Sequence, residues 1–269
     1  MNQAVQALPD TQMSPETRGL MLSHAGIRDL VHPLRVRDVD GSTQSTVATI
    51  NLSVGVPASQ RGTHMSRLVE FAHGPLADCD LASIRALADV MAGALDAQCA
   101  RIDLRFPWFL SRPAPVSGRP SLSDVQVRVR TSVGRGDATD GTILEVAAPV
   151  TTLCPCSKAI SRFGAHNQRS TVTVRARCNG TSPPIDRIVA TIEASGSCPV
   201  YAVLKREDEK HVTEAAYQNP KFAEDLVRDL WTRLHRDFTL QDAWVQTVNH
   251  ESIHNHSAYA STGDETLGS

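Results

Sequence analysis

Hydrophobic and polar residues alternate along several stretches of the chain, each about as long as a β-strand. The clearest is QSTVATINLSVGV at 44–56, where apolar residues occupy every second position, as in a half-buried strand. A second clear alternation covers 123–133. Shorter or less regular runs predict further strands at 100–109 with a break at Pro107, 142–150, 170–178, 187–193 and 242–249.

Two stretches have the period of a helix instead. Asp80 can cap a helix over 81–95, whose apolar residues recur every three or four positions. A second helix is expected after Asn219-Pro220, because proline suits a first helical turn. Its expected inward positions are Phe222, Leu226, Val227, Leu230, Trp231 and Leu234. Strands that bracket helices at irregular spacing favour an antiparallel α+β fold over alternating βαβ units.

Composition narrows the class of protein. The 269 residues include 27 Lys and Arg against 29 Asp and Glu, a net charge of −2, which argues against a polymeric nucleic-acid partner or a membrane surface. Residues 1–17 lack a signal-peptide pattern, and the six cysteines lack a regular spacing. We therefore expect a cytoplasmic protein with reduced thiols, a flexible arm over 1–25 and a flexible tail over 258–269.

Candidate metal ligands occur first at LCPCSK, residues 153–158, with a histidine at position 166. The two thiols, Cys154 and Cys156, are too close in sequence for both to bind one ion without a strained turn. One of them is expected to be a ligand and the other to lie beside it. Cationic neighbours of the thiols favour the thiolate form, and they are Lys158, Arg162 and Arg169.

Two further segments could complete a site. Residues 205–214 form a charged stretch, expected to be a solvated turn, that offers carboxylates. Residues 250–256 read HESIHNH, and His254 and His256 face the same way in an extended chain. A catalytic metal site needs three protein ligands and an open position for water, so thiolate, imidazole and carboxylate together predict metal-assisted hydrolysis. Phosphate-loop, dinucleotide, HExxH and GxSxG motifs are absent from the sequence.

Four motifs give the chain a specific resemblance. They are RGTHMSR at 61–67, LCPCSK at 153–158 with GAHNQR at 164–169, DEK at 208–210 with VTE at 212–214, and ESIHNH at 251–256. In this order they resemble the type IB GTP cyclohydrolases. One departure is Glu207, where that family leads us to expect proline.

The resemblance implies the tandem tunnelling fold, with a first module over 26–140 and a second over 141–257 that carries most of the site. Each module is an antiparallel sheet with helices packed on one side. It also implies a homo-oligomer, a tetramer with active sites between subunits. The implied reaction converts GTP and water to formate and 7,8-dihydroneopterin triphosphate, the first step of tetrahydrofolate biosynthesis.

The same resemblance assigns roles to residues. Cys154, His166 and Glu209 are the implied metal ligands, with Cys156 as the alternative thiol, for one divalent zinc, manganese or iron ion per site. His254 and His256 would move protons during catalysis. Glu224 is the candidate for holding the guanine edge, with Glu214 as its competitor. The cations available for the triphosphate include Arg67, Lys158, Arg162 and Arg169.

Two other hypotheses fit part of the pattern. A nitrile reductase on the same fold would use a cysteine nucleophile and NADPH, without a metal. A non-catalytic protein could hold a structural zinc, which usually needs four closed ligands. The histidine pair and the Cys–His–Glu set favour the hydrolytic metal site over both.

Overall fold

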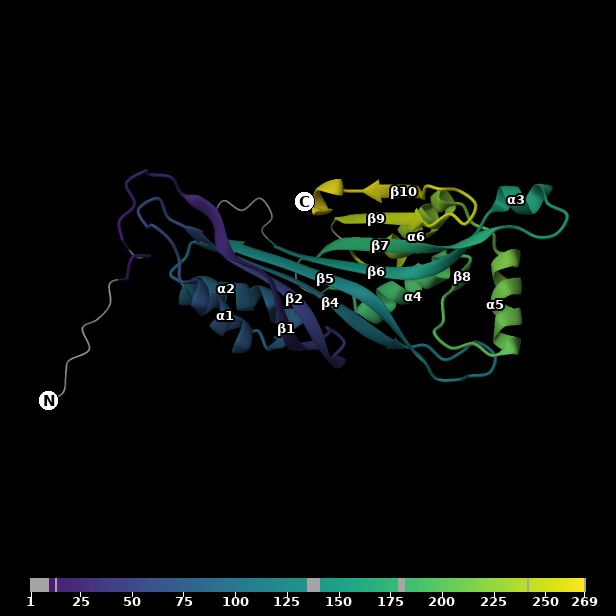
Figure 1. The fold of residues 1–269 in the computed structure, drawn as a ribbon, viewed down its shortest axis with the longest axis horizontal. Coiled ribbons are helices and arrows are strands. Elements are labelled where there is room, and N and C mark those ends of the chain that lie inside the picture. The colour runs from purple at the N-terminus through teal and green to yellow at the C-terminus, as the bar shows by residue number, and fades with distance from the viewer. Residues whose placement is uncertain (1–9, 13, 135–140, 179–181, 241, 269) are drawn as a thin grey trace.

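A computed structural model describes residues 10–12, 14–134, 141–178, 182–240 and 242–268 (Figure 1). The first half of the chain forms β1 (Leu22–Arg37), β2 (Thr43–Val56), α1 (Met65–His73), β3 (Asp78–Asp80), a 3-10 turn (Leu81–Ser83), α2 (Ile84–Ala94), β4 (Cys99–Ser111) and β5 (Leu122–Gly134).

The second half of the chain repeats the mixture of strands and helices. Its elements are β6 (Gly141–Leu153), α3 (Pro155–Ile160), β7 (Asn167–Cys178), α4 (Ile185–Ser195), β8 (Cys198–Pro199), α5 (Arg206–Gln218), α6 (Ala223–Asp237), β9 (Ala243–Asn249), β10 (Ala258–Gly263) and a final 3-10 turn (Glu265–Gly268).

In the described part of the chain, ten strands make one sheet with the order β10-β9-β7-β6-β5-β4-β2-β1-β3, and β8 pairs with β6 beside this path. All these pairings are antiparallel except that of β1 with β3. The two halves are joined directly, because β5 pairs with β6 over Gln126–Ser132. The result is one elongated antiparallel sheet (Figure 1), in agreement with the predicted α+β class.

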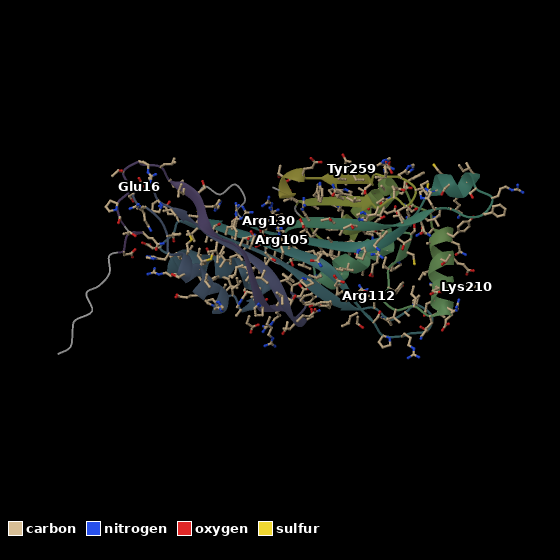
Figure 2. The ribbon with its side chains drawn as sticks, in the orientation of Figure 1. Glu16, Arg105, Arg112, Arg130, Lys210 and Tyr259 are labelled. Carbon is tan, nitrogen blue, oxygen red and sulfur yellow. The ribbon has the colours of Figure 1, made fainter. Side chains whose placement is uncertain are left out.

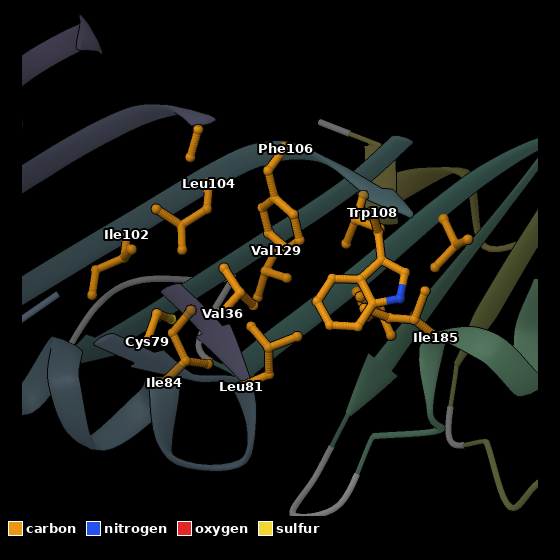
Figure 3. Close-up of a cluster of buried hydrophobic side chains, with 14 of the residues drawn as sticks. Val36, Cys79, Leu81, Ile84, Ile102, Leu104, Phe106, Trp108, Val129 and Ile185 are labelled. Carbon is orange, nitrogen blue, oxygen red and sulfur yellow. The ribbon is translucent and has the colours of Figure 1, made fainter. Parts of the chain in front are cut away.

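Four helices pack on one face of this sheet, and among the described residues the helical segment on the other face is the final 3-10 turn, which contacts β7 and β9 (Figure 1). The helices α1 and α2 pack on the first-half strands, and α4 and α6 on the second-half strands. Between sheet and helices lies a continuous apolar core, in which the β4 residues Leu104, Phe106 and Trp108 are at most 1% exposed (Figure 3). Burying apolar side chains of this size stabilises the fold by about 1.5–3 kcal/mol each.

The two halves also share polar contacts at the start of α4. The backbone N–H of Ile185 donates to Asp38 at the end of β1, at 2.7 Å. Trp108 of β4 donates its indole N–H to Asp186 in the first turn of α4. The first N–H groups of a helix have no partner within the helix. The carboxylate of Asp38, in the first half of the chain, therefore satisfies the N–H of Ile185 in the second half.

Most predicted elements are present, and three expectations are wrong. Residues 187–193 are helical. The buried aliphatic residues of this helix are Ile185, Ile188, Val189 and Ile192, and this spacing is that of a helix. The expected solvated turn at 205–214 is most of α5. The strand β4 continues through the expected break at Pro107. Its pairing with β2 ends at Arg105, so this proline need not donate to that strand.

The chain ends differ from the expected arm and tail. Residues 1–9 and 13 lie outside the described residues, and β1 begins at Leu22, inside the predicted arm. The prediction of a frayed tail over 258–269 is wrong for the described residues. There β10 pairs with β9, and Leu267 is buried against Ile143 and Trp244. The expected boundary between the modules, 140/141, adjoins residues 135–140, which lie outside the described residues; the described chain resumes at Gly141.

Asp208 joins α5 to the loop after β4. Its carboxylate is fully buried and accepts hydrogen bonds from the backbone N–H groups of Val116, Ser117 and Lys205, each at 2.8 Å, and from the Ser117 hydroxyl at 2.6 Å. Burial alone would raise the pKa of Asp208, but these donors outweigh it and hold the pKa well below its usual 3.8. The charged carboxylate therefore fixes the start of α5.

No helix among the described residues is both long and apolar enough to span a bilayer.

The first prediction concerns acid stability. A carboxyl whose folded pKa is depressed stabilises the protein above its unfolded pKa, and this contribution is lost as the pH falls toward the folded pKa. The melting temperature should therefore fall as the pH is lowered from 5 to below 3.8. Asp208→Asn should melt lower at pH 7 and lose less on acidification. Asp124→Asn, at an exposed site on β5, should retain the unchanged chain's dependence. Equal acid slopes for all three proteins would contradict the role given to Asp208.

Candidate functional site

The pairing of β6 with β7 brings the first two candidate ligands together. Leu153, the last residue of β6, pairs with Asn167, the first residue of β7. Cys154 follows the one and His166 precedes the other, so the two lie side by side at the open end of the strand pair. The backbone N–H of Cys154 donates to the carbonyl of His166 at 3.1 Å.

The segment between them is closed by a short helix. Cys154 is the N-cap of α3, and its sulfur accepts a hydrogen bond from the Ser157 N–H at 3.4 Å. The Ser157 hydroxyl bonds the Cys154 carbonyl and accepts from the His166 N–H, each at 3.2 Å. Proline suits the first turn of a helix, so Pro155 helps α3 begin directly after Cys154. Cys156 lies within α3 and is exposed.

The loop between β9 and β10 reaches the same end of the sheet. Asn249, the last residue of β9, pairs with Ser170 of β7 on one side and with Ala258 of β10 on the other. The loop 250–257 therefore projects beside Cys154 and His166. The rings of His254 and His256 stack there, with centroids 5.2 Å apart.

The start of α6 supplies a further wall. The backbone N–H of Lys221 donates to the Leu153 carbonyl at 3.0 Å, which ties this helix to the end of β6. Glu224 lies in the first turn of α6, and its side chain is exposed. An acid is favourable at this end of a helix, so the position alone did not identify a binding group.

These four elements enclose a cavity of about 300 Å³, the lower end of the range for small-molecule sites. It contains five residues that the sequence analysis assigned to the site, drawn from segments far apart in the chain. The lining residues are Cys154, His166, Gln168, Lys221, Phe222, Ala223, Glu224, Asn249, Glu251, His254, His256 and Ala258.

A buried polar chain orients His166. The side-chain amide of Gln168 donates from Nε2 to the Thr152 hydroxyl at 2.9 Å, and Thr152 bonds the Ser170 hydroxyl at 2.8 Å. The Gln168 oxygen therefore faces His166 Nδ1, at 3.0 Å, and accepts a hydrogen bond from the N–H of the ring. Glu251 approaches the same nitrogen at 3.8 Å. Because Gln168 and Glu251 both lie on the Nδ1 side of the ring, Nε2 is the nitrogen whose lone pair is available to a metal.

The donor types suit a divalent transition metal, because a thiol and an imidazole with a free Nε2 lie together beside carboxylates. The described residues contain no group of three His, Cys, Asp or Glu side chains close enough to hold an ion. Glu209, the implied third ligand, is exposed on α5 and does not line this cavity. One chain thus assembles two of the three implied ligands.

Other predicted residues lie around this cavity rather than in it. Glu214 of α5 pairs with Lys210 at 2.7 Å and lines a neighbouring cavity of about 480 Å³ with Phe163 and Tyr217. Lys158 donates to the Tyr217 carbonyl, and its Nζ lies 4.3 Å from the centre of the Tyr217 ring.

The remaining predicted cations do not line this cavity. Arg162 stacks against Phe163 at 5.9 Å on the exposed turn after α3. Arg169 lies on β7, where its carbonyl accepts from His250 N–H. Arg67 is on α1, at the opposite end of the long sheet from α3 (Figure 1).

The sequence analysis missed four polar residues of the cavity. Asn249 is the last residue of β9 and Glu251 follows it two positions later, a spacing that would place both on one side of an extended chain. Gln168 is part of the GAHNQR motif, but no role was assigned to it there, and Lys221 carried no signal, because it enters the cavity through the bond that anchors α6.

Comparison with known proteins agrees with this arrangement. The family model described as type I GTP cyclohydrolase folE2 matches residues 8–260. The curated protein named GTP cyclohydrolase FolE2 from Burkholderia thailandensis is 47% identical over 260 residues, covering 94% of this chain and 93% of its own. That of Methylobacillus flagellatus is 44% identical and covers 97% of both chains. That of Aromatoleum aromaticum is 44% identical and covers 96% of this chain and 94% of its own.

Solved structures support the fold alone. The urate oxidase of Bacillus sp. TB-90 matches with a TM-score of 0.50 at 10% identity, covering 91% of this chain and 100% of its own. A hyperthermostable mutant of that enzyme gives 0.51 at 11% identity, covering 91% of this chain and 99% of its own. These are tunnelling-fold proteins, which confirms the fold expected from the motifs. Since the family model and the FolE2 relatives cover nearly the whole chain, the chain belongs to the type I GTP cyclohydrolases of the FolE2 family.

Proposed function

We propose that this chain is a GTP cyclohydrolase that opens the imidazole ring of guanine in GTP with water. The products are formate and 7,8-dihydroneopterin triphosphate, the precursor that begins tetrahydrofolate synthesis in the cytoplasm. The observation that supports this most directly is the shared cavity of Cys154, His166, Glu224, His254 and His256. The nitrile reductase hypothesis is not favoured, because the relatives that match nearly the whole chain are named cyclohydrolases.

Cys154 and His166 are the proposed ligands of one divalent zinc, manganese or iron ion. Bound there, the ion supplies a Lewis acid that makes water a stronger nucleophile at neutral pH. Cys154 is favoured over Cys156 because Cys154 lines the cavity and Cys156 does not. Gln168 and Glu251 act as positioning residues, since both hold the Nδ1 side of His166 and so direct Nε2 into the cavity.

Glu224 is the proposed anchor of the guanine. A carboxylate can accept hydrogen bonds from the guanine N1–H and its 2-amino group together. Glu224 is open to a ligand at the cavity wall, whereas Glu214 lines a different cavity and is paired with Lys210. The geometry therefore favours Glu224 over its competitor.

His254 and His256 are the proposed proton carriers. They lie on the loop after β9 with their rings stacked, so that one ring can accept a proton close to where the other ring releases one. Imidazole exchanges protons near neutral pH. In this role they protonate the ring nitrogen that leaves as the C–N bonds break, and they accept the proton of the attacking water.

We further propose that the site is completed by a second copy of the chain, within a homotetramer. Arg67 is at the far end of the sheet from Cys154, and Glu209 is exposed on α5 (Figure 1). Ile160 at the end of α3 is 85% exposed and Phe163 in the following turn is 94% exposed, an apolar surface of the kind that marks contacts between proteins. Lys158, Arg162 and Arg169, with Arg67 from the neighbour, would hold the triphosphate.

The second prediction tests the activity. Protein loaded with zinc, manganese or iron should release formate from GTP and give fluorescent neopterin after oxidation and dephosphorylation. EDTA should abolish both products, because the reaction needs activated water. Cys154→Ala should remain folded and lose activity by about a hundredfold or more, since even outer partners of a metal site are worth 10–100-fold.

Cys156→Ala is the matched control for that experiment, because it removes an exposed thiol two positions away. It should retain at least half of the activity. Failure to form either product with any of the three metals would exclude the proposed function. Equal losses in the two variants would exclude the assignment of Cys154.

The third prediction tests whether Glu209 acts across subunits. Cys154→Ala and Glu209→Gln should each be inactive alone. If the two ligands come from different chains, mixed dimeric units contain one intact site in two, and random reassembly should restore about a quarter of the activity. Cys154→Ala mixed with His166→Ala is the control that should stay inactive, because both changes affect the same chain's contribution. No recovery in the first mixture would place Glu209 with its own chain's site.

A further inference from the structure

One polar side chain in the cavity of Cys154 has no part in the reaction proposed above. Asn249, the last residue of β9, lines this cavity and is only 3% exposed. Its backbone is held from both sides, because it pairs with Ser170 of β7 and with Ala258 of β10. The strand β10, on which Figure 2 labels Tyr259, lies along the outer side of β9. The sheet therefore fixes the position of Asn249.

Asn249 belongs to a buried polar layer between the apolar core and the cavity. Alternate residues of a strand share one face, so Val245, Thr247 and Asn249 follow one another toward the cavity, and all three are buried. On β7 the partners of the first two are valines, whereas the partner of Asn249 is the buried Ser170. Burying polar groups costs free energy unless they are hydrogen-bonded, so each group of this layer is expected to have a partner.

The hydroxyl of Thr247 determines which way the amide of Asn249 points. Thr247 is fully buried, and its Oγ1 donates to Asn249 Oδ1 at 3.2 Å. The oxygen of the amide is thus used within the protein. In the part of the chain that the structure describes, Asn249 Nδ2 makes no hydrogen bond and is not sealed off by other atoms. Its two hydrogens therefore remain for a molecule in the cavity.

Two other nitrogen donors of the cavity are already engaged. Gln168 donates from Nε2 to the Thr152 hydroxyl at 2.9 Å. The ammonium group of Lys221 pairs with Asp229 of α6, and only 17% of the lysine side chain is exposed. Asn249 is therefore the amide that can donate to a ligand without breaking a bond of the protein.

A donor that shares a cavity with a carboxylate matches one edge of guanine. Glu224 lines the same cavity as Asn249 and can accept from the guanine N1–H and 2-amino group. The next group on that edge is O6, which accepts hydrogen bonds. Adenine has an amino group at this position and no hydrogen on N1, so its edge would oppose both side chains. The pair of Glu224 and Asn249 therefore distinguishes the two purines.

We propose that Asn249 is a specificity-determining residue that donates from Nδ2 to O6 of the guanine of GTP. This inference rests on the proposed function, since it takes GTP as the molecule in the cavity and Glu224 as its anchor. Thr247 is the positioning residue for this contact, because its hydroxyl holds the amide oxygen away from the ligand. If the amide were reversed, its oxygen would face O6 as a second acceptor and leave both groups without a hydrogen bond.

The fourth prediction compares GTP with 6-thio-GTP, in which a sulfur atom, a weaker acceptor, replaces O6. In metal-loaded full-length protein, Asn249→Ala should lower kcat/KM for GTP about tenfold, the worth of one hydrogen bond. For 6-thio-GTP the same change should lower kcat/KM by less than about threefold. Formate release measures both reactions. A general loss of folded or metal-loaded protein would affect both nucleotides equally, so the difference between them reports the contact with O6.

Two further variants test the direction of the amide. Asn249→Asp keeps the shape of the side chain but places an acceptor opposite O6. It should lower kcat/KM for GTP about a hundredfold, and by more than for 6-thio-GTP. This variant also serves if Asn249→Ala does not fold. Thr247→Val removes the hydroxyl that orients the amide and should lower kcat/KM for GTP by less than Asn249→Ala does.

Gln246→Ala is the matched control, because it removes a side-chain amide from the other face of β9, outside the cavity. It should leave kcat/KM unchanged for both nucleotides. Equal losses for GTP and 6-thio-GTP in the Asn249 variants would overturn the proposal, and so would Asn249 variants that match Gln246→Ala. Both results require that the unchanged chain converts GTP. They are therefore distinct from failure of the proposed function, in which the unchanged chain releases no formate.

Discussion

The register in which β6, β7 and β9 pair is the constraint on which the candidate site depends. Leu153 opposite Asn167 places Cys154 beside His166, and Ser170 opposite Asn249 places the histidine loop beside both. A slip of one residue would turn every side chain of a strand to the other face. Alternating buried residues on these strands prevent such a slip, since Val172 and Val174 must face the helices. The packing of the core thus determines the relative positions of the residues in the candidate site.

How much of this could be predicted differs between elements for physical reasons. Strands with strict alternation, such as 44–56, were predictable because burial on one face imposes the period. The segment 187–193 was misassigned because a short β-branched run fits either period until Ile185 is included. The buried tail depends on Leu267 meeting Ile143 and Trp244, a contact that no local pattern contains. For the site, the motifs predicted Cys154 and His166, but not that Gln168 would orient the imidazole through Thr152.

The two faces of the sheet have different tasks. One face is closed by α1, α2, α4 and α6 and holds the apolar core. Among the described residues, the helical segment on the other face is the final 3-10 turn, and this face carries several arginines. In the second half, Arg175 pairs with Glu145 and Arg177 with Asp242 on this face. In the first half, the lining of one cavity contains four arginines and Asp103, which pairs with Arg128. The near-neutral net charge of the chain therefore does not describe the local distribution of charge on this face.

The length of the sheet bears on how a site of this family can be completed. A strand pair rises by about 3.3 Å per residue and neighbouring strands lie about 4.8 Å apart, so an elongated sheet separates its ends by more than any side chain can reach. Arg67 on α1 and Cys154 beside α3 are at such opposite ends (Figure 1). Their motifs can act on one substrate only if the end of one chain meets the other end of its neighbour. An open site with exposed Ile160 and Phe163 at its border is consistent with that arrangement, because the contact that buries these side chains would also bring the missing charges.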